Sequence, residues 1–344
     1  MIDSFIFLSP ILLLGVVALL GFVGCLSKPA PPIGIVTISP ASGPSTGNTP
    51  VTITGMGEIF NDSVAVKFGS PPNESDVPAT RVNDNVVTAV TPMHAAGPVA
   101  VEADYSVDGN DFKCVLADGS FFTYYDPIIP LQPPALSRVT AGSTNSASLP
   151  AATGRYLVIA TVQWGAGGGA TLNTPSAPGA NFIQIGVTDM LTPQRVATFY
   201  AFADLGSGLT VTATLTGTTN TDFNLLVSAY GNADPTSAPV LPVSGSGSGI
   251  APAPSLNLPT ATLAPGDVIY VVAIARLMGG LLKGQWAPGA GATPQIGAGG
   301  YLLLETYLLA QSDIDAGQIT VTATDQIGSA TSRWYLFAMG IVHS

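Results

Sequence analysis

The sequence predicts an all-β protein, on three observations. Apolar residues fall in short runs that alternate with polar residues and end at Gly, Pro or Asp. The 344 residues include 39 Gly and 29 Pro, yet 47% are hydrophobic, a mixture typical of many strands joined by tight turns. The densest apolar runs, such as Val268 to Ala275, carry β-branched residues, which favour strands. The length accommodates two or three domains.

Residues 1–27 are the exception, because they predict a hydrophobic helix that targets or anchors the chain. From Phe5 to Leu26 only Ser9 and Pro10 interrupt the apolar residues, and this length matches the roughly 20 residues of a membrane-spanning helix. Phe22 to Cys25 reads FVGC, which resembles a bacterial lipobox. That resemblance implies a lipidated Cys25.

The lipobox departs from the usual pattern at Phe22, and no Lys or Arg precedes the apolar run. Three outcomes therefore stay open: lipidation at Cys25, a retained transmembrane helix, or ordinary cleavage. Each places the rest of the chain outside the cytoplasm, at the cell surface or anchored to the membrane. The membrane is thus the first predicted partner, through the N-terminal segment.

The next stretch is a Pro-rich stalk at residues 28–34, followed by a domain at 35–127. Within it, residues 38–55 read ISPASGPSTGNTPVTITG: a turn cluster and then strict alternation. Later pieces are VKFG at 66–69, Thr91-Pro92 and a closing FTY at 122–124. These motifs resemble the IPT/TIG family, which implies an immunoglobulin-like β-sandwich at a surface and no single activity. Asn48 replaces a usual glycine, and Asn tolerates the positive φ of such a turn.

The C-terminal region predicts two tandem β-sandwich copies. Residues 210–214 and 320–324 are both TVTAT, and a Leu-Pro pair occurs at 149–150 and again at 258–259. Spacing near 110 residues and a shared order of elements indicate an internal duplication. We predict copy 1 at 135–234, a flexible Ser/Gly/Pro linker at 235–254 and copy 2 at 255–344. In their pattern of strands and turns, the copies resemble the jelly-roll-like modules of bacterial and phage surface proteins.

Charge and motifs narrow the classes of function. A net charge of −11 with scattered Lys and Arg argues against a nucleic-acid partner. The chain has two histidines, His94 and His343, and no zinc-binding spacing. The G-x-S-x-G pattern at 43–47 lies in the first turn of the IPT/TIG-like domain, where no nucleophile elbow can form. We therefore predict a protein that is not an enzyme and needs no cofactor.

Weaker candidate sites remain. Asp104, Asp108, Asn110 and Asp111 have the oxygen ligands that calcium prefers, although an Asp-Gly hairpin turn explains them more simply and is favoured. Trp164 and Trp286 end predicted strands beside Gly-rich loops, so they are the aromatic residues expected to be exposed for ligand binding. A glycoside hydrolase would need paired carboxylates, for which the C-terminal candidates are Asp189, Asp204, Asp267 and Glu305.

The sequence thus predicts a surface-anchored, non-enzymatic β-sandwich protein with a structural, adhesive or ligand-presenting role. The alternative is a carbohydrate-binding accessory protein that uses exposed aromatic residues of the C-terminal copies. Its partner would be a surface polysaccharide or protein.

Overall fold

The computed structural model describes most of the chain after residue 33, as nearly continuous β-structure. The described ranges are 34–56, 64–70, 72–107, 110–115, 121–139, 142–165, 169–190, 194–217, 223–248, 255–277, 286–288, 293–296, 302–309, 311–325 and 332–343. Within them one short helix occurs, α2 (Gln311–Asp315). The described residues contain no helix that is long and apolar enough to span a membrane. The predicted anchor at 1–27, with Cys25, lies outside the described residues, as does the stalk up to residue 33. The all-β prediction is confirmed.

The described residues form two compact units. The first comprises the chain up to Ser39, Pro50–Val90 and Ala100–Phe121. One of its sheets has the order β1-β3-β7-β6 and the other β10-β9-β4-β5. Their bounds are β1 (Gly34–Ser39), β3 (Pro50–Met56), β7 (Val86–Val90), β6 (Thr80–Asn83), β10 (Asn110–Val115), β9 (Val101–Val107), β4 (Val64–Phe68) and β5 (Ser75–Pro78). Alternation buries one face of each sheet, as Ile53 and Val87 show in the first and Val66 and Phe68 in the second.

The second unit begins with a small sheet of order β2-β11-β8, formed by β2 (Ser42–Pro44), β11 (Phe122–Tyr125) and β8 (Gly97–Val99). After β2 the chain turns through Gly47 and Asn48 with φ of 74° and 63°. The Asn48 amide donates to the Thr91 carbonyl at 2.9 Å. Asn48 therefore takes the left-handed conformation that the sequence predicted for it.

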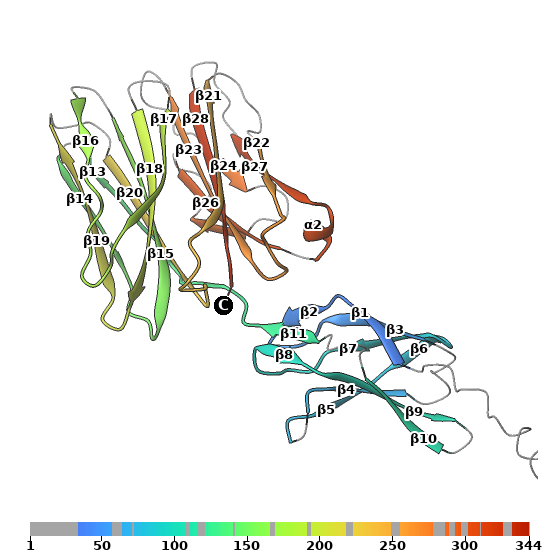
Figure 1. The fold of residues 1–344 in the computed structure, drawn as a ribbon. Helices are drawn as coiled ribbons and strands as arrows, with labels where there is room; N and C mark the ends of the chain where they lie inside the picture. The colour runs from blue at the N-terminus through green and yellow to red at the C-terminus, as the bar shows by residue number, and fades with distance from the viewer. Residues whose placement is uncertain are drawn as a thin grey trace, which may run out of the picture. The chain divides into compact units, whose positions relative to one another are not determined.

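Two β-sandwiches make up the rest of the second unit (Figure 1). The large sheet of the first has the order β12-β20-β15-β18-β17, with β13 also pairing with β20, and its small sheet has the order β14-β19-β16. The bounds are β12 (Ile129–Pro130), β13 (Ala135–Val139), β14 (Thr144–Leu149), β15 (Arg155–Gly165), β16 (Thr171–Leu172), β17 (Ile183–Met190), β18 (Gln194–Asp204), β19 (Leu209–Thr216) and β20 (Phe223–Gly231). The two sheets enclose a core that includes Val158, Phe199, Val211 and Phe223.

The second sandwich has a large sheet of order β21-β28-β23-β26-β25 and a small sheet of order β22-β27-β24. The bounds are β21 (Val240–Ser248), β22 (Ser255–Pro259), β23 (Val268–Leu277), β24 (Trp286–Pro288), β25 (Thr293–Ile296), β26 (Leu302–Leu308), β27 (Gln318–Asp325) and β28 (Ser332–Ile341). Its core includes Ile269, Leu309, Val321 and Ala338. In both TVTAT runs valine alternates with threonine, which predicts that Val211 and Val321 point inward. That prediction is confirmed, because both are fully buried.

The flexible linker predicted at 235–254 is wrong for residues 240–248, which form the edge strand β21. From Val243 to Ser248 the strand pairs with β28 without a gap, residue for residue. An edge strand is held by backbone hydrogen bonds on one side, so the small side chains of the Ser-Gly repeat suffice there. Apolar packing of β21 comes from Val240 and Val243, which contact the core of the second sandwich.

The two large sheets pack against each other through a third apolar core, which we call the shared core. It contains Ile159 and Leu226 from the first sandwich and Val272, Phe337 and Met339 from the second. The four sheets therefore stack as small, large, large, small (Figure 1). Hydroxyl groups lie within the shared core: Thr161 Oγ1 is 3.0 Å from Tyr270 Oη.

Candidate functional site

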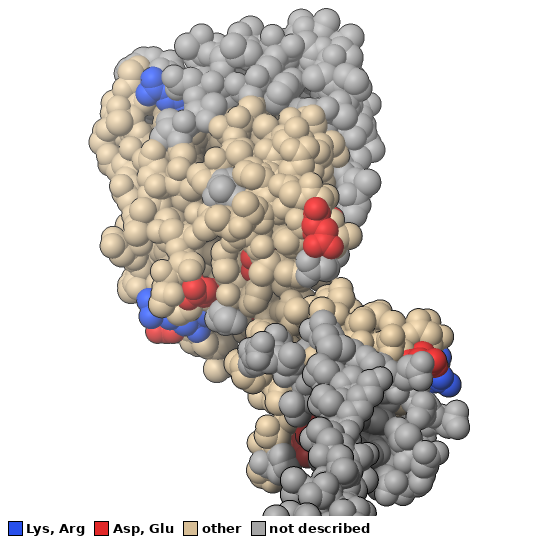
Figure 2. Space-filling view, turned by 45° about the vertical axis from the view of Figure 1, so that its right-hand side comes forward, with Lys and Arg blue, Asp and Glu red and all other residues tan. Residues whose placement is uncertain are grey.

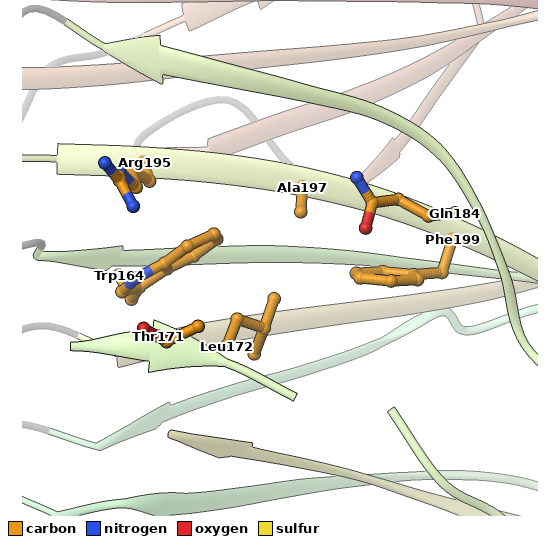
Figure 3. Close-up of a pocket in the computed structure, with 7 residues that line it drawn as sticks. All are labelled: Trp164, Thr171, Leu172, Gln184, Arg195, Ala197 and Phe199. Carbon is orange, nitrogen blue, oxygen red and sulfur yellow. The ribbon is translucent and has the colours of Figure 1, made fainter. Parts of the chain in front are cut away.

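The best candidate for a ligand site is a cavity of about 160 Å³ in the first sandwich, lined by side chains of both its sheets (Figure 3). The large sheet supplies Trp164 from β15, Gln184 from β17, and Arg195, Ala197 and Phe199 from β18. The small sheet supplies Thr171 and Leu172 from β16. We call this cavity the Trp164 pocket.

Strand periodicity explains how these residues come together. Arg195, Ala197 and Phe199 alternate along β18, so they share one face, and Trp164 pairs directly with Arg195 on the neighbouring strand. Gln184 pairs with Phe199 from the other side. Leu172 faces this group from the opposite sheet, next to its partner Leu215. The pocket thus lies where the edge strands β16 and β17 leave the sandwich open.

The walls of the pocket are apolar and its rim is polar. Trp164, Ala197 and Phe199 are buried and belong to the core of the first sandwich, while Thr171 and Gln184 are exposed. The Trp164 ring is fixed by a hydrogen bond from its Nε1–H to the Ala170 carbonyl, 3.4 Å away. A concave apolar site with a few polar groups at its edge is the usual form of a small-molecule site.

The predicted exposure of Trp164 is wrong, because its side chain is only 3% exposed. The ring follows Val158, Ala160 and Val162 on the inward face of β15, a period of two that continues to the end of the strand. One part of the ring nevertheless lines the pocket, so Trp164 is placed to contact a ligand from within the core.

Trp286 lies in β24, the edge strand of the second small sheet, where it pairs with Asp325. Its predicted role in binding a ligand stays a prediction.

The calcium candidates fall on the β9–β10 hairpin. Asp104 lies in β9, Asn110 and Asp111 lie in β10, and Asn110 pairs with Val107. Asp108 lies outside the described residues, between the two strands. The pairing of Val107 with Asn110 is compatible with the Asp-Gly hairpin turn that the sequence favours over a calcium site. Within the described part of the chain, no group of three His, Cys, Asp or Glu residues is placed to hold a metal ion.

A buried carboxylate lies immediately before β23, at Asp267, which the sequence had offered only as a candidate for a carboxylate pair. Asp267 is fully buried. One of its oxygens accepts the Ala264 backbone N–H at 2.8 Å; the other accepts the His343 backbone N–H at 2.9 Å and lies 2.6 Å from His343 Nδ1. The His343 ring packs against Tyr125, with 4.6 Å between ring centroids. Burial, and then the charge of Asp267, raise the pKa of Tyr125.

These bonds give Asp267 a structural role in holding the C-terminus, and they leave it poorly suited to the catalytic role considered for it. The other carboxylate whose side chain is described, Asp204, is exposed at the end of β18. Asp189 lies in β17 and Glu305 in β26. Charged side chains on the described surface form small, separate groups (Figure 2).

Comparison with known proteins identifies one protein family, and the similar solved structures include two distant ones. Residues 32–121 match the model of the IPT/TIG domain, and no curated protein matches the chain. Among solved structures, a structural genomics protein of unknown function from Bacteroides thetaiotaomicron VPI-5482 is 15% identical, with a TM-score of 0.23, over 36% of this chain and 34% of that one. The full extracellular region of plexin A4 is 13% identical, with a TM-score of 0.23, over 53% of this chain and 16% of that one.

This chain therefore spans about a third or less of the length of either structure. The family match covers both sheets of the first unit together with the turn at Gly47 and Asn48, where the sequence motifs also lie. The chain thus carries an IPT/TIG domain at residues 32–121.

Proposed function

We propose that this chain is a surface-anchored, non-enzymatic β-sandwich protein that presents ligand-binding or adhesive surfaces on a rigid support. The observation that carries the proposal is the shared core, because it joins two sandwiches through their large sheets. Packed apolar cores resist deformation, so the two sandwiches move together. The IPT/TIG domain and the apolar, Pro-rich N-terminus add the expected means of attachment at a surface.

The two sandwiches are best explained as tandem copies of one jelly-roll-like module. Strands β13 to β20 of the first sandwich correspond, in order, to strands β21 to β28 of the second. With each strand replaced by its counterpart, the sheet orders of the two sandwiches are identical. Registers agree as well: Leu149 pairs with Leu209 in the first small sheet, and Leu258 pairs with Ile319 in the second. A duplication followed by divergence accounts for both the topology and the repeated TVTAT strands.

Anchoring is tested at Cys25. If lipid is attached there, Cys25→Ser is expected to abolish incorporation of labelled fatty acid and to leave the precursor unprocessed. The measurement is metabolic labelling with membrane fractionation, and Cys114→Ser is the matched control. Equal labelling of wild type and Cys25→Ser would exclude lipidation at this residue, and membrane retention without labelling would support a retained helix at 5–26.

A second candidate function, binding of pyranose rings, is supported by the Trp164 pocket. An engineered apolar cavity of about 150 Å³ binds benzene, and the pocket, at about 160 Å³ with an open rim, has room for part of a sugar ring. The carbon-bound hydrogens of a pyranose form an apolar face, which would meet the parts of Trp164, Leu172 and Phe199 that line the pocket. Its hydroxyls would meet the Gln184 amide and the Arg195 guanidinium, groups that offer several hydrogen-bond donors.

Gln184→Ala tests this function with little risk to the fold, because Gln184 is exposed. Loss of one hydrogen bond to a sugar hydroxyl is expected to weaken binding about tenfold, or roughly 1.4 kcal/mol. The measurement is the Kd for cellotetraose, chitotetraose and tetragalacturonate, which cover neutral, N-acetylated and acidic pyranoses. Gln318→Ala, at an exposed position that begins β27, is the matched control. Binding that is equal in both variants would place the site elsewhere, and absence of binding to all three would reject the function.

A further inference from the structure

A small side chain in the middle of the Trp164 pocket creates its depth. Along the inward face of β18, Ala197 lies between Arg195 and Phe199, and Trp164 on the neighbouring strand pairs with Arg195. Alanine has no side-chain atom beyond Cβ, so the large sheet is hollowed at Ala197 and raised on either side of it. Leu172 faces this hollow from the small sheet (Figure 3).

Two aromatic residues bound the hollow along the strands. Trp164 and Phe199 lie at its opposite ends (Figure 3). They are four residues apart in register, which is about 13 Å along the sheet at roughly 3.3 Å per residue. The two rings themselves fill part of that length. A run of linked sugar rings lying along the strands would collide with both aromatic rings, so the hollow has room for no more than one sugar.

The aromatic rings are walls of the pocket and not an open platform. Trp164 is 3% exposed and Phe199 is 2% exposed. An internal sugar of a polysaccharide carries further sugars on both sides, so it can rest only on a ring face that is open to solvent. A sugar that reaches Trp164 and Phe199 must instead enter between the edge strands β16 and β17, where the described walls leave the pocket open.

We propose that the Trp164 pocket binds the terminal sugar of a chain or branch, inserted end-on, and that it excludes internal sugars of a polysaccharide. A terminal ring has one linkage, which can leave through the opening, whereas an internal ring has two. Its hydroxyls at the rim would meet the Gln184 amide and the Thr171 hydroxyl, both of which are exposed. This inference rests on the pyranose-binding function proposed above and names the part of the saccharide that the site takes.

The dependence of affinity on saccharide length tests the inference. The full chain is titrated calorimetrically with cello-, chito- and galacturono-oligosaccharides of two, four and six sugars. Because only the terminal ring enters the pocket, the Kd in any series that binds is expected to change by less than about fivefold between two and six sugars.

A groove that contacts several rings would gain affinity with each added sugar. A decrease in Kd of more than about fivefold from two to six sugars would therefore overturn end-on binding and leave pyranose binding in place. No binding in any of the three series would reject both.

The number of chain ends in a polymer gives a second readout. Amorphous cellulose, colloidal chitin or polygalacturonate, whichever matches the series that binds, is partially hydrolysed, so that the number of chain ends rises at constant mass. The amount of protein bound per gram at saturation is expected to rise in proportion to the chain ends. A capacity that stays constant would show that internal sugars are bound and would contradict the inference.

Ala197→Val tests whether the hollow is the site. Its two added methyl groups occupy the middle of the pocket, and a β-branched side chain suits a strand. Binding of disaccharide and hexasaccharide is expected to weaken equally, by about tenfold or more. Ala135→Val is the matched control, because Ala135 is half-buried on β13, at the opposite edge of the same sheet, and wild-type affinity is expected for it.

An unchanged melting temperature checks that each variant is folded. Wild-type affinity of folded Ala197→Val would place saccharide binding outside the pocket and would contradict both the inference and the function on which it rests. If Ala197→Val does not fold, the length series with the wild-type chain alone decides.

Discussion

Raising the pH from 9 to 12 is expected to lower the free energy of unfolding of the double sandwich by a few kcal/mol, chiefly through Tyr230 and Tyr270. Both are fully buried in the shared core. Burial raises the pKa of each well above its usual value. The neighbouring Tyr270 further raises the pKa of Tyr230, and Tyr335 further raises the pKa of Tyr270. The Thr161 hydroxyl, 3.0 Å from Tyr270 Oη, opposes the shift in part.

The sign follows from proton binding. An unfolded tyrosine loses its proton near pH 10, while the folded-state phenols keep theirs, so the native state binds more protons and stability falls as pH rises. The stabilisation is complete below pH 10 and is lost above it, toward the folded-state pKa. Each pH unit over which the unfolded phenol is ionised and the folded one is not lowers the free energy of unfolding by about 1.4 kcal/mol per tyrosine.

Urea unfolding at several pH values measures this dependence. The double variant Tyr230→Phe, Tyr270→Phe is expected to be less stable at pH 8, because the Thr161 hydrogen bond is lost, and to show a much flatter decline above pH 10. A decline as steep in the double variant as in the wild type would show that other groups cause the alkaline loss.

Asp267→Ala is expected to destabilise the second sandwich by about 3 kcal/mol. The substitution removes the acceptor of two backbone N–H groups and the partner of His343 Nδ1, all close to a fully buried carboxylate. A buried donor that loses its acceptor and cannot reach water lowers the free energy of unfolding by an amount of this order. The C-terminal residues after β28 are also expected to be released from β23.

Asp204→Ala is the control, because Asp204 is exposed at the end of β18, and its effect is expected to stay within about 0.5 kcal/mol. Denaturant unfolding of both variants gives the comparison. Similar effects of the two substitutions would mean that the hydrogen bonds of Asp267 contribute little.

Local sequence features predicted much of the fold. The motif at 38–55 was enough to indicate the IPT/TIG domain, and the alternation around Val211 and Val321 gave the inward face of two strands that are 110 residues apart. The turn at Asn48 was predicted because its conformation depends on one residue type. These features are local, so they can be read from a short stretch of chain.

Other features depend on contacts between distant residues. Strand β21 was missed because a Ser-Gly repeat has no apolar pattern, and its pairing with β28 becomes visible only once the sheet is built. Trp164 was expected to be exposed because a Gly-rich segment follows it, although continued alternation along β15 already favoured burial. Asp267, His343 and Tyr125 are brought together from three separate parts of the chain, and no spacing rule predicts that.

The proposed function requires that the two sandwiches form one rigid body, and differential scanning calorimetry of the chain from residue 34 onward tests this directly. The IPT/TIG domain and the double sandwich are expected to give two transitions, and the transition of the double sandwich is expected to have equal calorimetric and van't Hoff enthalpies. A third transition, or a calorimetric enthalpy about twice the van't Hoff value for the double sandwich, would show that the sandwiches unfold independently and would contradict the account.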